Sequence, residues 1–192
     1  MIRRLYDWTL SLAEHPRALW ALAVVSFVES SVFPIPPDVL ILPMVLARPR
    51  RAWLIAAVAT VASVLGALAG YWIGATLFDQ VGRPVLDFYG KADEIDAFNA
   101  TFNDWGAWAV LIAGITPFPF KVITIVSGWT GLSIPVFVMA SIVARGLRFF
   151  IVAGLLRVFG EPIRAFIERR LNLVFIVFCV LLVGGFLVLH YV

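Results

Sequence analysis

A long uncharged apolar run is the feature that most constrains this chain. Residues 52–78 contain no Asp, Glu, Lys or Arg. About 20 apolar residues in a helix, each rising about 1.5 Å, cross the roughly 30 Å hydrocarbon core of a bilayer. Residues 132–159 are apolar apart from three arginines, and residues 171–192 are uncharged with one histidine near their end. We therefore predict three membrane-crossing helices, at 52–78, 132–159 and 171–192.

The composition supports a membrane protein. Of the 192 residues, 62% are hydrophobic and 14% are charged, whereas soluble domains average roughly 45–50% and about 25%. The net charge of +3 does not indicate nucleic-acid binding, because the basic residues punctuate apolar segments. One cysteine, Cys179, and two distant histidines, His15 and His190, exclude a disulfide framework and a His/Cys metal cluster. We expect no metal and no cofactor.

Proline-rich breaks divide two further apolar regions, residues 18–47 and residues 105–129. Each arm has about 8–11 residues, roughly half a bilayer, and proline prevents a continuous helix through the break. Irregular backbone at membrane depth is tolerated only inside protein or beside a water-filled cavity. We predict two re-entrant helical hairpins with buried breaks; the alternative is that proline-rich turns merely join short helices. The break prolines are Pro34, Pro36, Pro37, Pro117 and Pro119.

The two halves of the chain form a repeat. Residues 34–38 and 117–121 superimpose at an offset of 83, and each break precedes a crossing helix. In each repeat the hairpin does not cross the membrane and the helix crosses it once, so the two repeats must have opposite orientations in the membrane. Inverted repeats with broken helices are typical of transporters, whose substrate site lies near the bilayer midplane. We predict an all-α integral membrane protein with a single domain. The domain contains two inverted repeats, each a re-entrant helical hairpin plus a transmembrane helix, and a further C-terminal transmembrane helix follows them.

The charge distribution predicts the orientation. A cytoplasmic N-terminus leaves three arginine-rich stretches on that side: the N-terminal segment, residues 48–51 and the linker at 160–170. The acidic segment at 79–104 then lies outside, as the positive-inside rule requires. Apolar residues at helical spacing predict interfacial amphipathic helices at 1–16 and within 79–104.

Three glycines spaced four apart, Gly66, Gly70 and Gly74, form a small-residue ridge on the first crossing helix. Such a ridge permits close helix packing, within one chain or in a dimer. We favour packing within the chain because two hairpins need a tight neighbour; the oligomeric state stays open.

Five ionisable residues lie at membrane depth, where each costs at least about 2.5–3.5 kcal/mol by insertion scales. They are Glu29, Asp38, Lys121, Arg145 and Arg148. The three cations exceed the two anions, and surplus positive charge built from arginine suits a phosphate gripped by two parallel hydrogen bonds. We predict that the cations bind the headgroup while the two carboxylates hold them otherwise and exchange protons. The alternative is that the ion pairs only fasten the hairpins to the bundle.

Two motifs resemble a known family. Glu29-Ser-Ser-Val-Phe-Pro-Ile-Pro-Pro-Asp38 resembles the first signature of the DedA / SNARE-associated Golgi (VTT-domain) membrane proteins. Residues 114–128, Gly-Ile-Thr-Pro-Phe-Pro-Phe-Lys-Val-Ile-Thr-Ile-Val-Ser-Gly, resemble the second, closest to the YqaA-type bacterial branch. The second signature usually carries arginines where this chain has Thr116 and Lys121.

The resemblance implies a bacterial inner-membrane lipid transporter, a flippase or scramblase that moves polyprenyl phosphate or phospholipids between leaflets with dependence on proton motive force. Its partners would be lipids with a phosphate headgroup and protons. An enzyme is disfavoured, because neither histidine lies near Ser127 or the arginines to act as base or nucleophile. The alternative function is a proton-coupled small-ion or drug exporter.

Overall fold

The computed structural model describes most of the predicted hairpins and crossing helices. The described residues are 17–32, 36–78, 80, 92–116, 119–160 and 162, with the side chains of 92–97 left out. Several predictions lie outside them: the interfacial helix at 1–16, nearly all of the linker at 160–170, the third crossing helix at 171–192, and the prolines Pro34 and Pro117.

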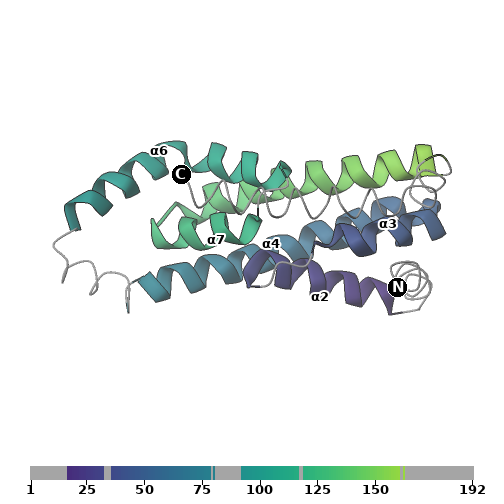
Figure 1. The fold of residues 1–192 in the computed structure, drawn as a ribbon, viewed down its shortest axis with the longest axis horizontal. Coiled ribbons are helices and arrows are strands. Elements are labelled where there is room, and N and C mark those ends of the chain that lie inside the picture. Colours follow the sequence, from purple (N-terminus) through teal and green to yellow (C-terminus); the bar gives the residue numbers. More distant parts are fainter. Residues whose placement is uncertain are drawn as a thin grey trace, which may run out of the picture.

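All regular structure in the described residues is helical, as the sequence predicts. The elements are α2 (Ala18–Ser31), α3 (Asp38–Ala47), the 3-10 turn η1 (Pro49–Arg51), α4 (Ala52–Leu77), α6 (Ala92–Ile115), α7 (Phe120–Trp129) and an unlabelled helix, Ile134–Gly160 (Figure 1). The segments Pro49–Leu77 and Ile134–Gly160 have mean hydropathies of 2.1 and 2.0 and are long enough to cross a bilayer. Two long apolar helices are thus confirmed.

A proline directly precedes each short helix that follows a break. α3 begins directly after Pro37 and α7 directly after Pro119, whose φ angles are −64° and −62°. Proline suits the start of a helix because its φ is already helical and its missing N–H has no partner there. In Figure 1, α3 turns back toward the end from which α2 starts, and α7 turns back toward the start of α6. In the same view the ends of α2 and α6 that adjoin the breaks lie alongside α4 and the Ile134–Gly160 helix, which both continue past them.

The second hairpin differs from the predicted segments in its first arm. Residues on both sides of position 104 belong to one continuous helix, α6, because no proline interrupts the sequence between 92 and 115. The predicted amphipathic stripe partly packs inward: the ring centroid of Phe98 lies 5.9 Å from that of Trp129 in α7 and 6.1 Å from that of Phe102.

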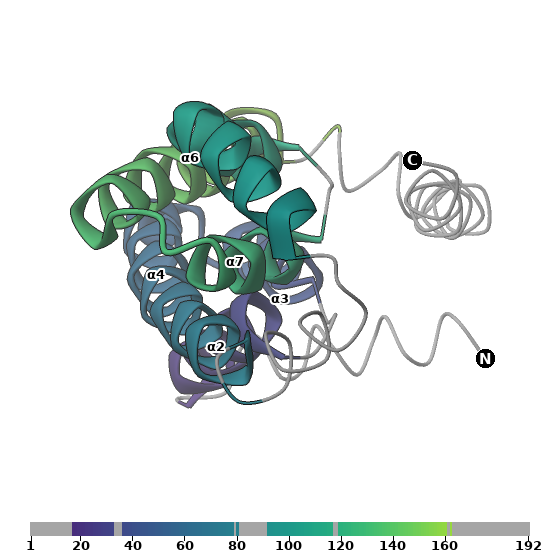
Figure 2. The ribbon, with the colours of Figure 1, turned by 90° about the vertical axis from the view of Figure 1, so that its left-hand side faces the viewer.

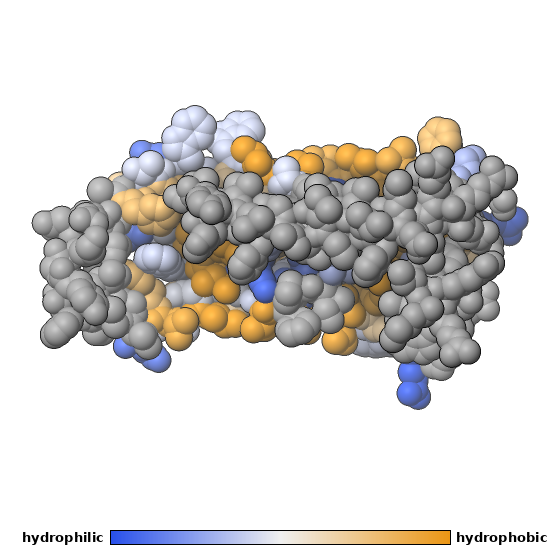
Figure 3. Space-filling view, viewed as in Figure 1, coloured by the Kyte–Doolittle hydropathy of each residue, from blue (hydrophilic) through white to orange (hydrophobic). Residues whose placement is uncertain are grey.

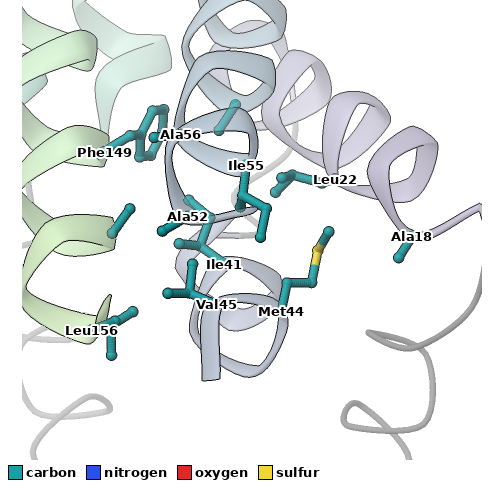
Figure 4. Packing of buried hydrophobic residues seen from close by; sticks show 12 residues of the cluster. Ala18, Leu22, Ile41, Met44, Val45, Ala52, Ile55, Ala56, Phe149 and Leu156 are labelled. Carbon is teal, nitrogen blue, oxygen red and sulfur yellow. The ribbon is translucent and has the colours of Figure 1, made fainter. Parts of the chain in front are cut away.

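Each hairpin has its own apolar core against the two long helices. The first core joins α2, α3, the start of α4 and the end of the Ile134–Gly160 helix through residues such as Leu22, Ile41, Ile55 and Phe149 (Figure 4). The second joins α4, α6, α7 and residue Phe137 of the long helix, and Figure 2 shows α7 between α4 and α6. The long helices therefore carry both hairpins, one toward each end.

The glycine ridge of α4 lies against both hairpins. A Cβ on Gly66 would meet the backbone of Phe27 in α2, and a Cβ on Gly74 would meet the backbone of Ile125 in α7. Between them, a Cβ on Gly70 would meet Thr124 of α7 and lie 3.1 Å from the carbonyl oxygen of Ser30 in α2. These close approaches let α2 and α7 meet side by side on α4 at the breaks.

Candidate functional site: two ion pairs at the helix breaks

Arg145 lies in a closed hydrogen-bonded ring between three helices. Its Nη2 donates to Glu29 Oε2 of α2, and its Nε donates to Ser63 Oγ of α4 at 2.6 Å. Ser30 Oγ donates to Glu29 Oε2 at 3.0 Å and lies 2.6 Å from Ser63 Oγ. Because a hydroxyl has one proton, Ser63 is the donor to Ser30. The two serine hydroxyls, Glu29 Oε2 and the Nε and Nη2 atoms of Arg145 thus all find partners within the protein.

Aromatic rings enclose the same guanidinium. The centroids of Phe120 and Phe149 lie 4.8 Å and 4.7 Å from Arg145 Cζ, within the range of cation–π attraction. The side chain of Arg145 is 1% exposed and that of Glu29 is 13% exposed. The sequence alone places Arg145 against a cavity; the structure instead places it inside packed protein.

Arg148 makes the second ion pair, which is much more open. Its Nη2 donates to Asp38 Oδ2 at 2.6 Å, and its Nη1 donates to the carbonyl oxygen of Thr116 at 2.8 Å. The side chains of Arg148 and Asp38 are 20% and 31% exposed. Since Asp38 ends the first break and Thr116 begins the second, one guanidinium joins both breaks.

Lys121 also connects the two breaks, from the end of the second break to the start of the first. Its Nζ lies 3.4 Å from the carbonyl oxygen of Val32, where the first break begins, although Lys121 itself follows the second break. Thr124, one turn further along α7, donates to the carbonyl oxygen of Ser30 at 3.0 Å. The described residues offer Lys121 no ion pair, so this cation is the positive charge left over after the two arginines are paired.

The five ionisable residues predicted from the sequence therefore come together around the two breaks. We call Glu29, Asp38, Lys121, Arg145 and Arg148, with the hydroxyls of Ser30 and Ser63, the polar centre. The remaining described break prolines frame it: Pro37 is buried, and Pro36 and Pro119 are partly buried. No group of three His, Cys, Asp or Glu side chains that could hold a metal ion occurs among the described residues.

Sequence reasoning missed the serines and phenylalanines that enclose Arg145. One signal was available, because hydroxyl side chains in apolar helices need hydrogen-bond partners at membrane depth. Ser63 lies in the uncharged run of α4, and Ser30 directly follows Glu29. Phe120 and Phe149 carried no such signal, because apolar rings are common in any packed helix.

Most of the chain matches the model of one protein family. The VTT domain matches residues 35–158, from the first break to the end of the second long helix. The chain belongs to the VTT-domain (DedA) family. With this membership and its two long apolar helices, it is a membrane protein. Four of the five charged residues lie within the VTT match, and Glu29 precedes it.

Two relatives of this VTT-domain chain come from bacteria. A protein of Haemophilus influenzae is 34% identical over 170 residues, which cover 88% of each chain. A protein of Histophilus somni is 31% identical over 170 residues with the same coverage. Neither description names an activity. No solved structure matches the chain significantly.

Proposed function

We propose that this VTT-domain protein moves lipids with a phosphate headgroup between membrane leaflets, as a flippase or scramblase. The observation that carries the proposal is the partly exposed Arg148–Asp38 pair, with Arg148 near the middle of the long apolar helix Ile134–Gly160. Ionisable groups inside a membrane are costly, and they mark substrate pathways by default. Arginine suits phosphate because its planar fork offers two parallel hydrogen bonds.

Aromatic residues on α4 support placement of the polar centre near the bilayer midplane. Trp53 and Trp72 are 45% and 58% exposed. They are 19 positions apart, which corresponds to a rise of about 28 Å in a helix, close to the thickness of the hydrocarbon core. Exposed tryptophans favour the two membrane interfaces. With the breaks halfway between them, α2–α3 and α6–α7 become re-entrant hairpins of two inverted repeats.

The surroundings of the open ion pair favour a lipid over a small solute. Exposed hydrophobic side chains adjoin it in the sequence on each element that contributes to it: Val39 beside Asp38, Ile115 beside Thr116 and Leu147 beside Arg148. Figure 3 shows hydrophilic atoms at mid-length of one face, between hydrophobic residues. A lipid can therefore bring its headgroup to the cation while its tails stay on apolar protein surface.

The arginines indicate the orientation. Arg50 and Arg51 are exposed beside the start of α4, and Arg157 lies over the ring of Trp53 at 5.6 Å, so these three cations share one end of the protein. We propose that this end faces the cytoplasm of a bacterial inner membrane, together with the N-terminus. Cysteines replacing Arg50 and Asp96, in a Cys179→Ser background, should label from opposite sides of sealed cells; labelling from one side refutes the topology.

We also propose that lipid translocation is coupled to proton binding. Glu29 and Asp38 each pair with an arginine, and Arg145 and Arg148 lie about one turn apart on the same helix. Lipid bound at Arg148 therefore changes the field at both carboxylates, so that lipid and proton binding are linked. Glu29→Gln and Asp38→Asn should flatten the pH dependence of translocation. If both variants keep the wild-type pH profile, passive scrambling replaces the proton-driven cycle.

Translocation by purified protein in liposomes tests the function. Vesicles with a trace of headgroup-labelled fluorescent phospholipid are treated with an impermeant quencher, which bleaches only the outer leaflet. Wild-type protein should bring inner-leaflet lipid to the quencher much faster than protein-free vesicles do, while vesicles loaded with a small anionic or cationic dye retain it. Dye efflux driven by a proton gradient without lipid movement would favour the exporter instead.

A further inference from the structure

We propose that Arg148 is the residue that binds lipid phosphate, and that Asp38 is a built-in competitor for the same guanidinium edge. This rests on the proposed function and deepens it by dividing the polar centre into two roles. In this division, Arg148 and Asp38 form the exchangeable ligand site. Arg145 is a positioning residue that fixes α2, α4 and α7 around it without touching lipid.

The burial and the contacts of Arg145 argue against lipid binding at this residue. Its Nη2 and Nε are bound to Glu29 and Ser63, two phenylalanine rings pack against its guanidinium, and its side chain is 1% exposed. Exchanging Glu29 for phosphate would open the serine ring and strip the partner from a buried carboxylate. A buried pair that loses one partner leaves an uncompensated charge, which strongly disfavours exchange.

The contacts of Arg148 permit exchange. The carbonyl oxygen of Thr116 holds Nη1 at 2.8 Å and so orients the guanidinium plane, while Nη2 is turned to Asp38 at 2.6 Å. Among the described residues, nothing hydrogen-bonds to Nε of Arg148 or to Oδ1 of Asp38. A phosphate oxygen accepts the same type of charged hydrogen bond as a carboxylate oxygen. The Arg148–Asp38 pair is less enclosed than the Arg145–Glu29 pair, so the carboxylate of Asp38 can give way to phosphate.

The charge count of the polar centre supports a monoanionic headgroup. Two carboxylates and three cations leave one positive charge, that of Lys121, whose described contact is the carbonyl oxygen of Val32. One phosphodiester charge brings the sum to zero without removing Asp38 from the site. Lys121 therefore balances the displaced Asp38 while Arg148 binds the phosphate, and restoring the Asp38–Arg148 pair provides a route for release.

Measurements of lipid binding by the full chain test whether Arg148 binds the phosphate and Asp38 competes with it. The probe is fluorescent phosphatidylglycerol, a monoanionic phosphodiester, at increasing fractions in phosphatidylcholine nanodiscs that contain the protein. Asp38→Asn should tighten binding by roughly twofold to fivefold, the size expected when a partly exposed ion pair stops competing. Arg148→Gln should weaken binding by at least about tenfold. Arg148→Lys keeps the charge and the fold but loses the planar fork, and should weaken binding by a smaller factor.

Matched controls separate this effect from a change in net charge. Asp104→Asn and Arg157→Gln make the same chemical changes at exposed positions of α6 and the Ile134–Gly160 helix, and both should bind like wild type. Unchanged or weaker binding by Asp38→Asn overturns the competition, and unchanged binding by both Arg148 variants overturns the ligand assignment. Wild-type protein that translocates lipid while these variants bind normally refutes only this inference. Wild-type protein that neither binds nor translocates lipid refutes the proposed function itself.

Discussion

Arg145 and Arg148 lie on the same helix and each pairs with one carboxylate at the first break, yet their surroundings are opposite. Arg145 is enclosed by Glu29, two serine hydroxyls and two aromatic rings at 1% exposure. Arg148 is 20% exposed and has one carboxylate and one carbonyl as partners. The difference teaches that intramembrane charges need not share one role: a satisfied buried pair holds helices together, and an open pair is free to exchange its partner.

The largest effect should come from breaking the enclosed pair. Arg145→Gln leaves Glu29 buried without a counter-charge, and we expect the free energy of unfolding to fall by about 3–5 kcal/mol. Unfolding in mixed detergent micelles, followed by tryptophan fluorescence, measures it. Arg157→Gln on the same helix should change the stability by no more than about 0.5 kcal/mol. Equal losses in the two variants would mean that the ring around Arg145 contributes nothing to stability.

Breaking the open Arg148–Asp38 pair should affect lipid translocation more than stability. Arg148→Gln should slow lipid translocation at least about tenfold, equivalent to about 1.4 kcal/mol. Its free energy of unfolding should fall by only about 1 kcal/mol, because the pair is partly exposed and its loss does not leave Asp38 enclosed in packed protein. Translocation in liposomes and unfolding of the same preparation give both numbers. A stability loss as large as that of Arg145→Gln would erase the distinction between the pairs.

A smaller effect should follow from opening the serine ring. Ser63→Ala removes the acceptor of Arg145 Nε and the donor to Ser30, while the Glu29–Arg145 ion pair stays. We expect the stability to fall by about 1–3 kcal/mol, the range for leaving a buried polar group unpaired, with the lower half favoured because the ion pair remains. Thr76→Ala in the same helix, whose hydroxyl is exposed and bonds only to its own helix, is the matched control. A stability equal to that of wild type would show that the ring does not hold Arg145.

The sequence was informative about which residues matter and poor at pairing them. Charged residues are so costly in apolar helices that all five charged members of the polar centre could be identified from the sequence, and prolines marked the breaks. Nothing local says that Glu29 pairs with Arg145 and Asp38 with Arg148, because these pairs join residues 116 and 110 positions apart. The continuous α6 also escaped prediction, because a change from amphipathic to apolar character does not itself end a helix.

The central claim is that the lipid reaches Arg148 and not Arg145, and chemical footprinting of the unmutated protein tests it directly. An arginine-selective dicarbonyl reagent is applied to protein in phosphatidylcholine liposomes with and without phosphatidylglycerol, and mass spectrometry measures the modification of each arginine. We predict that Arg148 is modified and becomes protected as phosphatidylglycerol increases, that Arg145 stays unmodified in both, and that exposed Arg157 reacts equally in both. Modification of Arg145 with lipid-dependent protection, or of Arg148 without protection, would contradict it.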